Sequence, residues 1–419
     1  MKTVEEIRKA VETASASHVK IGVCDIDGIL RGKYMARDKF LSSLEGGFGF
    51  CDVVLGWDAN DQLYDNTKMT GWHTGYGDAP VRILPETMRE LPSEPGVLFF
   101  MGEFAGEMES ICPRGVLRRV LARGEELGFA AKAACEYEFL VVEETAESLA
   151  GKGYRGMAPH GTGNFGYSVI RNSVNTPFYQ GLLDFFEAFG VPIEGLHEET
   201  GPGALEAAIR VDDALEAGTR GVLFKTFAKV AAQRMGVFTS FMAKWNSELP
   251  GQGGHVHVSL QDADGKGVFR DEDDPQGLSR PMRHFIGGLQ QLSPQIAALA
   301  APTVNSYKRL VPGYWAPTAA TWGIDNRTVA IRAGFWGVAN EVEPSAAMTG
   351  NAYTQDCEER FQLPRTLGEA AVALENSAAA REIFGDAFVD HFAATRMWEE
   401  REARRQVTDW EMARYFEII

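Results

Sequence analysis

Two acidic residues interrupt an apolar run between Ala133 and Val142, which reads A-A-C-E-Y-E-F-L-V-V. Side chains alternate between the two faces of a β-strand, so Glu136 and Glu138 share one face and Tyr137 lies on the other. Neighbouring carboxylates repel each other, and burying them requires a counter-ion. A hard divalent cation such as Mg²⁺ or Mn²⁺ suits several convergent carboxylates. The plainer alternative is an edge strand whose acidic face is solvated.

A second group of acids follows in the stretch H-E-E-T-G-P-G-A-L-E, which begins at His197. Its Gly-Pro-Gly turn lets the chain reverse, so Glu199 and Glu206 can converge across the turn. Acids that flank a Gly-Pro loop also serve as ordinary turn caps. That interpretation stays open for each acid taken singly.

Histidines and glycines come together in P-G-Q-G-G-H-V-H-V-S-L. His255 and His257 share one face of the expected strand, and the glycines before them let the backbone approach a ligand closely. A His-x-His pair alone is a weak indication of a metal site. The acidic groups upstream, with no positive charge nearby in the sequence, make this indication much stronger.

Cationic residues occupy the loop N-S-Y-K-R-L-V-P-G-Y-W-A-P and the segment D-N-R-T-V-A-I-R that follows it. Arg327 and Arg332 would lie on opposite faces of a regular strand, so at least one must turn at a strand end to share a site. Fixed guanidinium groups suit carboxylate and phosphoryl oxygens. A surface salt bridge remains the alternative for either arginine alone.

The remaining pattern predicts two units that position these residues. The first is rich in β-structure, with helices over 3–14 and 37–44, a hairpin over 19–35 that turns at Asp27-Gly28, and strands over 48–57 and 97–104. A helix over 115–128 leads into the acidic strand, so the domain boundary is expected near 109–113. In the second unit we expect helices over 177–189, 213–235, 279–300 and 367–383, and strands over 193–197, 205–211, 238–243, 255–260 and 328–332. The charged run over 397–405 indicates a solvated helix.

The composition excludes several classes of protein. The 419 residues carry a formal net charge of −17, which argues against a surface for nucleic acid or for an anionic membrane. The five cysteines include no C-x-x-C pair, so neither a disulfide framework nor a zinc knuckle is indicated, and a reducing cytoplasm fits best. The first ten residues carry acids where a signal peptide has its apolar core, and no apolar run reaches the length of a membrane span.

Taken in order, the motifs resemble those of the glutamine synthetase superfamily of ATP-dependent amide ligases. D-I-D-G-I-L-R-G-K and L-G-W-D-A-N-D are similar to its β-grasp domain, and E-x-E, G-P-G…E, G-x-G-G-H-x-H-x-S and N-S-Y-K-R-L-V-P-G are similar to its catalytic domain. The resemblance implies an α+β fold, with an N-terminal β-grasp domain over 1–110. A catalytic ATP- and metal-binding α/β domain with a curved, mainly antiparallel sheet would follow over 111–419. The bacterial glutamine synthetase-like proteins, which look most similar, include several that join glutamate to amines other than ammonia.

The resemblance also implies two metal sites and a reaction. Glu138, Glu199 and Glu206 would hold one Mg²⁺ or Mn²⁺ ion, and Glu136 and His255 would hold the other. The family reaction forms an acyl phosphate on the glutamate side chain, which an amine then attacks. Metals and arginines neutralise the charge of the transferring phosphoryl group. The family also forms stacked rings, in which a neighbour's N-terminal domain completes each site.

Other matched residues would contact the substrates. Gly251 and Arg309 would take the α-amino and α-carboxylate groups of the acid. His257 and Ser259 would face ATP. The nucleotide phosphates and the transferring phosphoryl group would be contacted by Arg327 and Arg332.

One departure from the family pattern changes the expected amine. Where ammonia-using members have a glutamate that takes a proton from ammonium, this chain has Trp315, in G-Y-W-A-P. Tryptophan accepts no proton, but its ring offers a flat apolar wall. We therefore expect a carbon-bearing amine, aliphatic or aromatic, to pack there instead of ammonia.

A second departure follows Arg332, where the family has an R-x-E-x-R segment and then an N-P-Y helix start. This chain passes directly into A-G-F-W-G-V-A-N-E-V-E-P, in which Glu341 and Glu343 imitate the pattern without its arginines. Without compensation, the second metal loses a carboxylate and the site loses arginines for the phosphate and the substrate. One transition-state donor typically contributes on the order of 10²–10³ in rate.

Three hypotheses remain open from the sequence. The first is a ligase that uses ATP and a divalent metal to join the γ-carboxylate of glutamate to an amine other than ammonia. The second is a catalytically impaired member that serves as a nucleotide- or metabolite-binding ring protein. The third is a related ligase that acts on another acid, which the absent carboxylate-binding arginine would permit.

Overall fold

The structure, a computed structural model, describes residues 3–331 and 340–416. Its first sheet grows from the hairpin expected at Asp27-Gly28, in which β1 (His18–Cys24) and β2 (Leu30–Ala36) pair antiparallel. Gly28 has the positive φ of 72° that this tight turn requires. The sheet order is β2-β1-β5-β4-β3, and only β1 and β5 run parallel. The other strands are β3 (Phe48–Cys51), β4 (Asp78–Glu90) and β5 (Leu98–Phe104).

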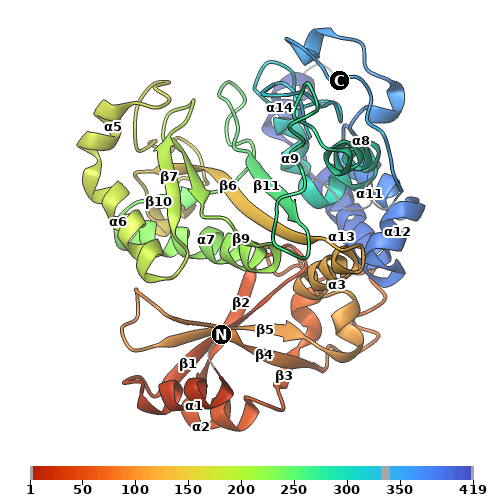
Figure 1. The fold of residues 1–419 in the computed structure, drawn as a ribbon. Helices are drawn as coiled ribbons and strands as arrows, with labels where there is room; N and C mark the ends of the chain where they lie inside the picture. Colours follow the sequence, from red (N-terminus) through yellow and green to blue (C-terminus); the bar gives the residue numbers. More distant parts are fainter. Residues whose placement is uncertain (1–2, 332–339, 417–419) are drawn as a thin grey trace.

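Two helices, α1 (Val4–Thr13) and α2 (Arg37–Ser43), cover one face of this sheet (Figure 1). Ile7 and Phe40 are fully buried there, and Phe40 packs on Phe100 of β5 with 4.5 Å between ring centroids. The expected strand over 48–57 ends early, because the chain enters a 3₁₀ turn over Asp52–Leu55. The long strand β4 was not expected from the sequence.

The second sheet is antiparallel and is built around β6 (Ala130–Val142) (Figure 1). β8 and β9 pair with one side of β6, and β11 and β10 pair with the other. The edge-strand alternative for the acidic strand is therefore wrong. Its partner strands are β7 (Ile193–Glu198), which pairs with β8, and β8 (Ala204–Ile209), β9 (Asp212–Asp213), β10 (Phe238–Ser240) and β11 (Gly254–Gln261).

Helix α7 (Ala214–Arg234) lies between the two sheets and joins their cores. Its Phe224 packs on Tyr137 of β6 at 6.0 Å between ring centroids, and its Phe227 packs on Phe99 of β5 at 6.0 Å. The apolar face of β6 therefore points to α7, as the alternation predicted, and its acidic face points away. α3 (Pro113–Glu126) and α6 (Thr176–Ala188) pack against α7, and the same part of the chain contains the short helices α4 (Ala146–Gly151) and α5 (Val169–Val174).

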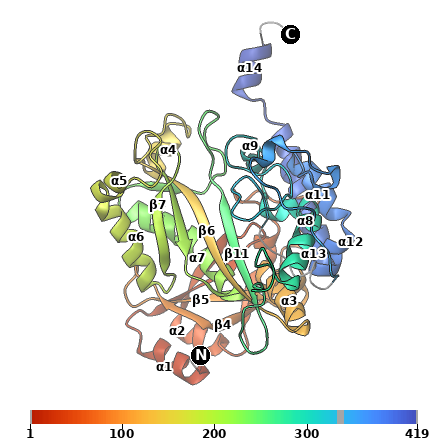
Figure 2. The same ribbon diagram turned by 45° about the horizontal axis from the view of Figure 1, so that its top comes forward.

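A group of helices packs beside the second sheet, and α14 projects from it (Figure 2). Its members are α8 (Arg280–Ala300), α9 (Val304–Arg309), α11 (Leu367–Glu375), α12 (Ala378–Phe384), α13 (Asp386–Arg404) and α14 (Asp409–Tyr415). The single helix expected over 367–383 is two helices, because Ser377 caps α12 by accepting a hydrogen bond from the Ala380 amide. The helix expected over 397–405 is the end of α13. In the parts of the chain that are described, no helix combines the length and apolar character needed to cross a membrane.

His391 on α13 makes a pH-sensitive contact with the first unit. Its Nε2 donates to the Leu55 carbonyl oxygen over 2.7 Å, and its Nδ1 is buried with no hydrogen-bond partner among the described residues. Burial lowers the pKa of His391 from 6.5 to about 4, so folding favours the neutral ring. The resulting stability is complete above pH 6.5 and is lost as the pH falls towards 4.

Wild-type protein is therefore expected to lose about 2 kcal/mol of unfolding free energy at this residue between pH 7 and pH 5. Urea unfolding at the two pH values measures this loss. His391→Gln keeps an amide donor for Leu55 but does not titrate, so its stability should fall less over the same interval. Equal losses in both proteins would contradict the prediction.

Candidate functional site

The register of the second sheet aligns acids and histidines across four strands. Glu138 of β6 lies opposite Glu206 of β8, which in turn lies opposite His197 of β7. On the other side of β6, Glu136 lies opposite His255 of β11. Directly opposed residues have adjacent side chains on one face. The sheet therefore gathers acids and imidazoles from four separate parts of the sequence.

Glu206 stands at the centre of this arrangement. With Glu136 and His255 it forms one group whose ligand atoms all lie within 4.8 Å of one another, and with His197 and Glu199 it forms another. His255 Nδ1 is 2.9 Å from Glu136 Oε1, and His197 Nε2 is 3.1 Å from Glu199 Oε1. Such clusters of carboxylate oxygens and imidazole nitrogens fit divalent cations.

The charges of the cluster are not balanced within it. Burial raises the pKa of Glu206 to about 7, and the neighbouring carboxylates add to the rise. Burial also raises the pKa of Glu138. A hydrogen bond to Glu136 raises the pKa of His255, and a hydrogen bond to Glu199 raises the pKa of His197. Bound cations would relieve this repulsion, so the donor set fits the divalent metals inferred from the sequence.

The Gly-Pro-Gly turn brings Glu199 to Glu206, as expected. The amide of Glu199 donates to the Ala204 carbonyl oxygen over 2.8 Å, which closes the turn. Gly203 has a φ of 71°, and a Cβ there would lie 2.4 Å from the Val141 carbonyl oxygen. Only glycine lets the turn lie so close to β6.

Gly251 and Arg309 also meet. A Cβ on Gly251 would lie 2.3 Å from Arg309 Cδ and 2.1 Å from the Ala243 carbonyl oxygen. The Arg309 side chain is buried, its Nη1 donates to the Tyr314 carbonyl oxygen over 2.6 Å, and its Nε has no hydrogen-bond partner among the described residues. Burial lowers the pKa of Arg309, while Glu138 acts in the opposite direction. A carboxylate ligand would satisfy this guanidinium.

The other expected site residues lie at the margin of the cluster. His257 Nε2 is 3.7 Å from Glu136 Oε2, Ser259 is exposed further along β11, and Trp315 is 63% exposed with a φ of 60°. Arg327 is exposed in a turn. The pKa of Glu199 is lowered chiefly by its hydrogen bond with His197, and the charge of Arg327 adds to this lowering.

The strand expected over 328–332 is wrong for its described part. Residues 328–331 form a turn followed by irregular chain, because Asn326 binds the Thr328 amide and hydroxyl through its side-chain oxygen and so favours a turn. Arg332, expected to contact the nucleotide phosphates, lies outside the described residues.

His197 is a site residue for which no ligand role was predicted. It contacts both Glu199 and Glu206, and its ring stacks on Tyr167 at 4.3 Å between centroids. Its spacing of two from Glu199 was a usable signal, because alternate strand residues share a face.

Comparison with known proteins gives similarity to glutamine synthetases and to related glutamate–amine ligases. A model of the glutamine synthetase catalytic domain matches residues 110–333 and 331–415. A type-1 glutamine synthetase of Dictyostelium discoideum is 42% identical, with 100% of this chain and 87% of that protein covered. A glutamate–isopropylamine ligase of a Pseudomonas species is 31% identical (100% and 99% covered), and a γ-glutamylethanolamide synthetase of Streptomyces coelicolor is 35% identical (99% and 96% covered). A solved structure described as a GmaS/ADP complex shares the fold, with a TM-score of 0.83, 24% identity and 98% and 99% coverage.

The two pieces of the family match meet at residues 331–333, where the sequence lacks the expected R-x-E-x-R segment. The alignment with the Dictyostelium protein also runs over 457 residues, although this chain has only 419. The relatives therefore carry residues that this chain does not. Since the catalytic-domain model spans residues 110–415 and relatives above 30% identity align with nearly the whole chain, this protein belongs to the glutamine synthetase family.

Proposed function

We propose that this protein is an ATP-dependent γ-glutamyl amide ligase that joins glutamate to an amine other than ammonia. Family membership implies ATP and divalent-metal use. The observation that carries the proposal is the cluster of acids and histidines centred on Glu206. The similar proteins include a glutamate–isopropylamine ligase and a γ-glutamylethanolamide synthetase, which supports an amine other than ammonia. In the reaction, the γ-carboxylate takes the terminal phosphoryl group of ATP and ADP leaves. The amine nitrogen then bonds to the γ-carbonyl carbon, phosphate leaves, and the nitrogen loses a proton.

We assign two Mg²⁺ or Mn²⁺ ions to this cluster, and the second ion's site is the less complete. Glu199, His197 and Glu206, with Glu138 beside them, would hold the first ion, and Glu136, His255 and Glu206 would hold the second. When bound, the metals would neutralise phosphate charge and polarise the phosphoryl group.

Other residues would bind and orient the substrates. Arg309 would pair with the α-carboxylate of glutamate, and the Gly251 backbone would take the α-amino group. The residues assigned to ATP and its phosphates are His257, Ser259, Arg327 and Arg332.

We also retain the division into a β-grasp domain over 1–110 and a catalytic domain over 111–419. A ring assembly would bring a neighbour's N-terminal domain to each site. This part of the proposal rests on the family pattern, and light scattering of the purified protein tests the assembly.

A phosphate-release assay tests the proposed function. The full-length protein is mixed with Mg²⁺, ATP, L-glutamate and, in separate reactions, ammonium, isopropylamine, ethanolamine or an aromatic amine. Release that depends on an amine, with the γ-glutamyl amide detected by mass spectrometry, is the expected result. Replacing glutamate by aspartate or 2-oxoglutarate in the same assay tests whether another acid is the true substrate.

Trp315 is expected to set the choice of amine. Trp315→Glu would supply a proton acceptor and remove the apolar wall, so the ratio of kcat/KM for ammonium to that for isopropylamine should rise about tenfold. Trp315→Phe keeps an apolar ring and should leave the ratio near its wild-type value. Unchanged ratios in both variants would remove Trp315 from the amine site.

The break at residues 331–333 favours one second candidate, a nucleotide-binding member with little or no turnover. Such a protein would bind ATP in a calorimetric titration and release no phosphate with any amine. Amine-dependent release contradicts this alternative.

A further inference from the structure

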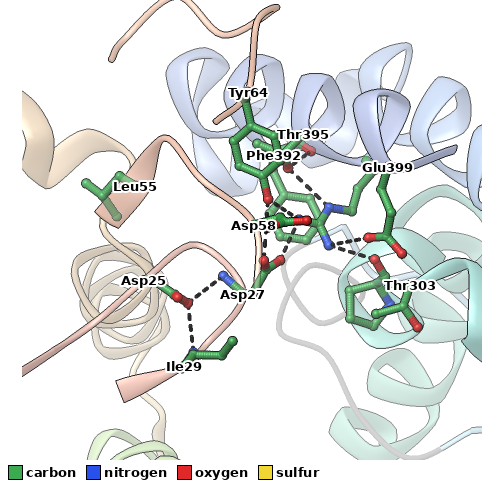
Figure 3. Close-up of polar contacts among 12 residues, drawn as sticks. Asp25, Asp27, Ile29, Leu55, Asp58, Tyr64, Thr303, Phe392, Thr395 and Glu399 are labelled. Carbon is green, nitrogen blue, oxygen red and sulfur yellow. Dashed lines mark hydrogen bonds and ion pairs between the residues drawn. The ribbon is translucent and has the colours of Figure 1, made fainter. Parts of the chain in front are cut away.

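Arg396 on α13 is a buried cation far along the chain from the residues of the proposed site. Its side chain is 1% exposed, which makes it one of the largest fully buried side chains of the protein. A buried guanidinium is stable only when acids and carbonyl oxygens satisfy it. Figure 3 shows Asp27, Tyr64 and Glu399 converging in this region from three separate segments.

One side of Arg396 faces the N-terminal hairpin. Nη2 forms an ion pair with Asp27 at the β1–β2 turn and lies 3.3 Å from the Tyr64 hydroxyl. Hydrogen bonds stabilise the turn itself, because Asp25 Oδ1 accepts the amides of Asp27 and Ile29 over 2.9 and 2.8 Å (Figure 3). Arg396 is thus fixed to a stable part of the first unit.

The other side of Arg396 faces the start of α9. Nη1 donates to the Pro302 carbonyl oxygen over 2.6 Å. The same nitrogen is 3.5 Å from Glu399 Oε2, and Glu399 Oε1 accepts the Val304 amide over 2.9 Å. Arg396 and Glu399 together therefore hold the two backbone groups that flank Thr303, the N-cap of α9.

Helix α9 is only six residues long, and it carries Arg309 at its end. At its second residue, Asn305 binds the backbone amide and carbonyl of Lys244 over 2.8 and 2.9 Å. The residue before Lys244, Ala243, accepts the Gln252 amide over 2.8 Å, next to Gly251. The contacts therefore hold the N-cap and the first two residues of α9, and because the helix is so short, its position at this end also sets the position of Arg309.

We propose that Arg396, acting with Glu399, is a positioning residue for substrate binding: it fixes the start of α9 to the N-terminal hairpin and so sets Arg309 against Gly251. This inference rests on the proposed function, in which Arg309 takes the α-carboxylate of glutamate. Arg396 itself does not touch that site. Its loss should loosen acid binding while leaving His257 and Ser259, the β11 residues assigned to ATP, in place.

Steady-state kinetics of the full-length protein with L-glutamate, ATP and isopropylamine test the proposal. Arg396→Gln and Glu399→Gln should each raise the KM for glutamate about tenfold, with the KM for ATP within about twofold of wild type. Arg396→Lys keeps the charge and should recover part of the loss. Arg401→Gln is the matched control, since Arg401 also links α13 to the first unit, through Asp65 at 2.7 Å, without contacting α9.

Hydrogen–deuterium exchange separates failure of this inference from failure of the proposed function. The amides of residues 304–309 should exchange faster in Glu399→Gln than in wild type, and at the wild-type rate in Arg401→Gln. If the wild-type protein shows no turnover but exchange is still faster in Glu399→Gln, the proposed ligase activity is contradicted. The inference that Arg396 and Glu399 hold the start of α9 then stands. Wild-type exchange and an unchanged KM for glutamate in folded Glu399→Gln would overturn the positioning role, even if Arg396→Gln does not fold.

Discussion

Glu206→Gln is expected to reduce amine-dependent phosphate release about 10³-fold, which is the cost of removing one major electrostatic group from a phosphoryl-transfer site. Glu206 is the one acid common to both candidate metal groups, so its loss weakens both sites together. Glutamine keeps the size of the side chain and one acceptor oxygen. The assay is phosphate release with saturating Mg²⁺, ATP, glutamate and the best amine of the panel.

The structure supplies a control and a second readout for this variant. Glu194→Gln changes an acid of β7 that is half exposed and paired with Arg210, so its activity should match wild type. In EDTA, Glu206→Gln should be at least as stable as wild type, because it removes one of several crowded like charges. Metal should raise the melting temperature of wild type more than that of the variant. Near-normal activity in Glu206→Gln would exclude Glu206 as a ligand.

Local sequence signals were sufficient to predict structure where the position of a residue depends only on its neighbours in the chain. Alternation placed Tyr137 in the core and Glu136 and Glu138 on the opposite face, and β6 has this arrangement. Asp27-Gly28 predicted a hairpin and Gly-Pro-Gly predicted a reversal, since both depend on backbone conformations that glycine adopts readily.

Strand pairing could not be predicted in the same way. Nothing local in the sequence states that His197 lies opposite Glu206, because register depends on which strands pair across the whole sheet. For the same reason the acidic strand could not be distinguished from an edge strand until β8 and β11 were placed on either side of it.

The burial of Arg396 on α13 could not be predicted either, because it depends on residues that are distant in the sequence. Arg396 directly precedes the charged run over 397–405, which is typical of a solvated helix, and only its packing against Asp27 and Pro302 buries it. The strand prediction for residues 328–331 failed for a different reason. The T-V-A-I stretch has β-propensity, but the side chain of Asn326 stabilises a turn there by accepting the Thr328 amide.

Gly251→Ala is expected to lower kcat/KM for glutamate about 10²-fold, the effect of a displacement near 1 Å in a substrate-positioning group. The new Cβ would lie 2.1 Å from the Ala243 carbonyl oxygen and 2.3 Å from Arg309 Cδ, so the backbone of the loop and the arginine must both shift. Arg309 is buried and donates to the Tyr314 carbonyl oxygen, so a shift of its side chain costs packing and this hydrogen bond. Titrating glutamate at saturating ATP and amine measures the effect.

Gly253→Ala is the matched control in the same loop. A Cβ at this position would meet only the Glu138 carboxylate, at 3.6 Å, which is an ordinary contact, and the Gly253 amide would still donate to Glu138. Its KM for glutamate should therefore stay within about threefold of wild type. The pair of variants separates two explanations: equal losses would indicate that the loop tolerates no side chain at all, whereas a loss confined to Gly251→Ala places the acid substrate against Arg309.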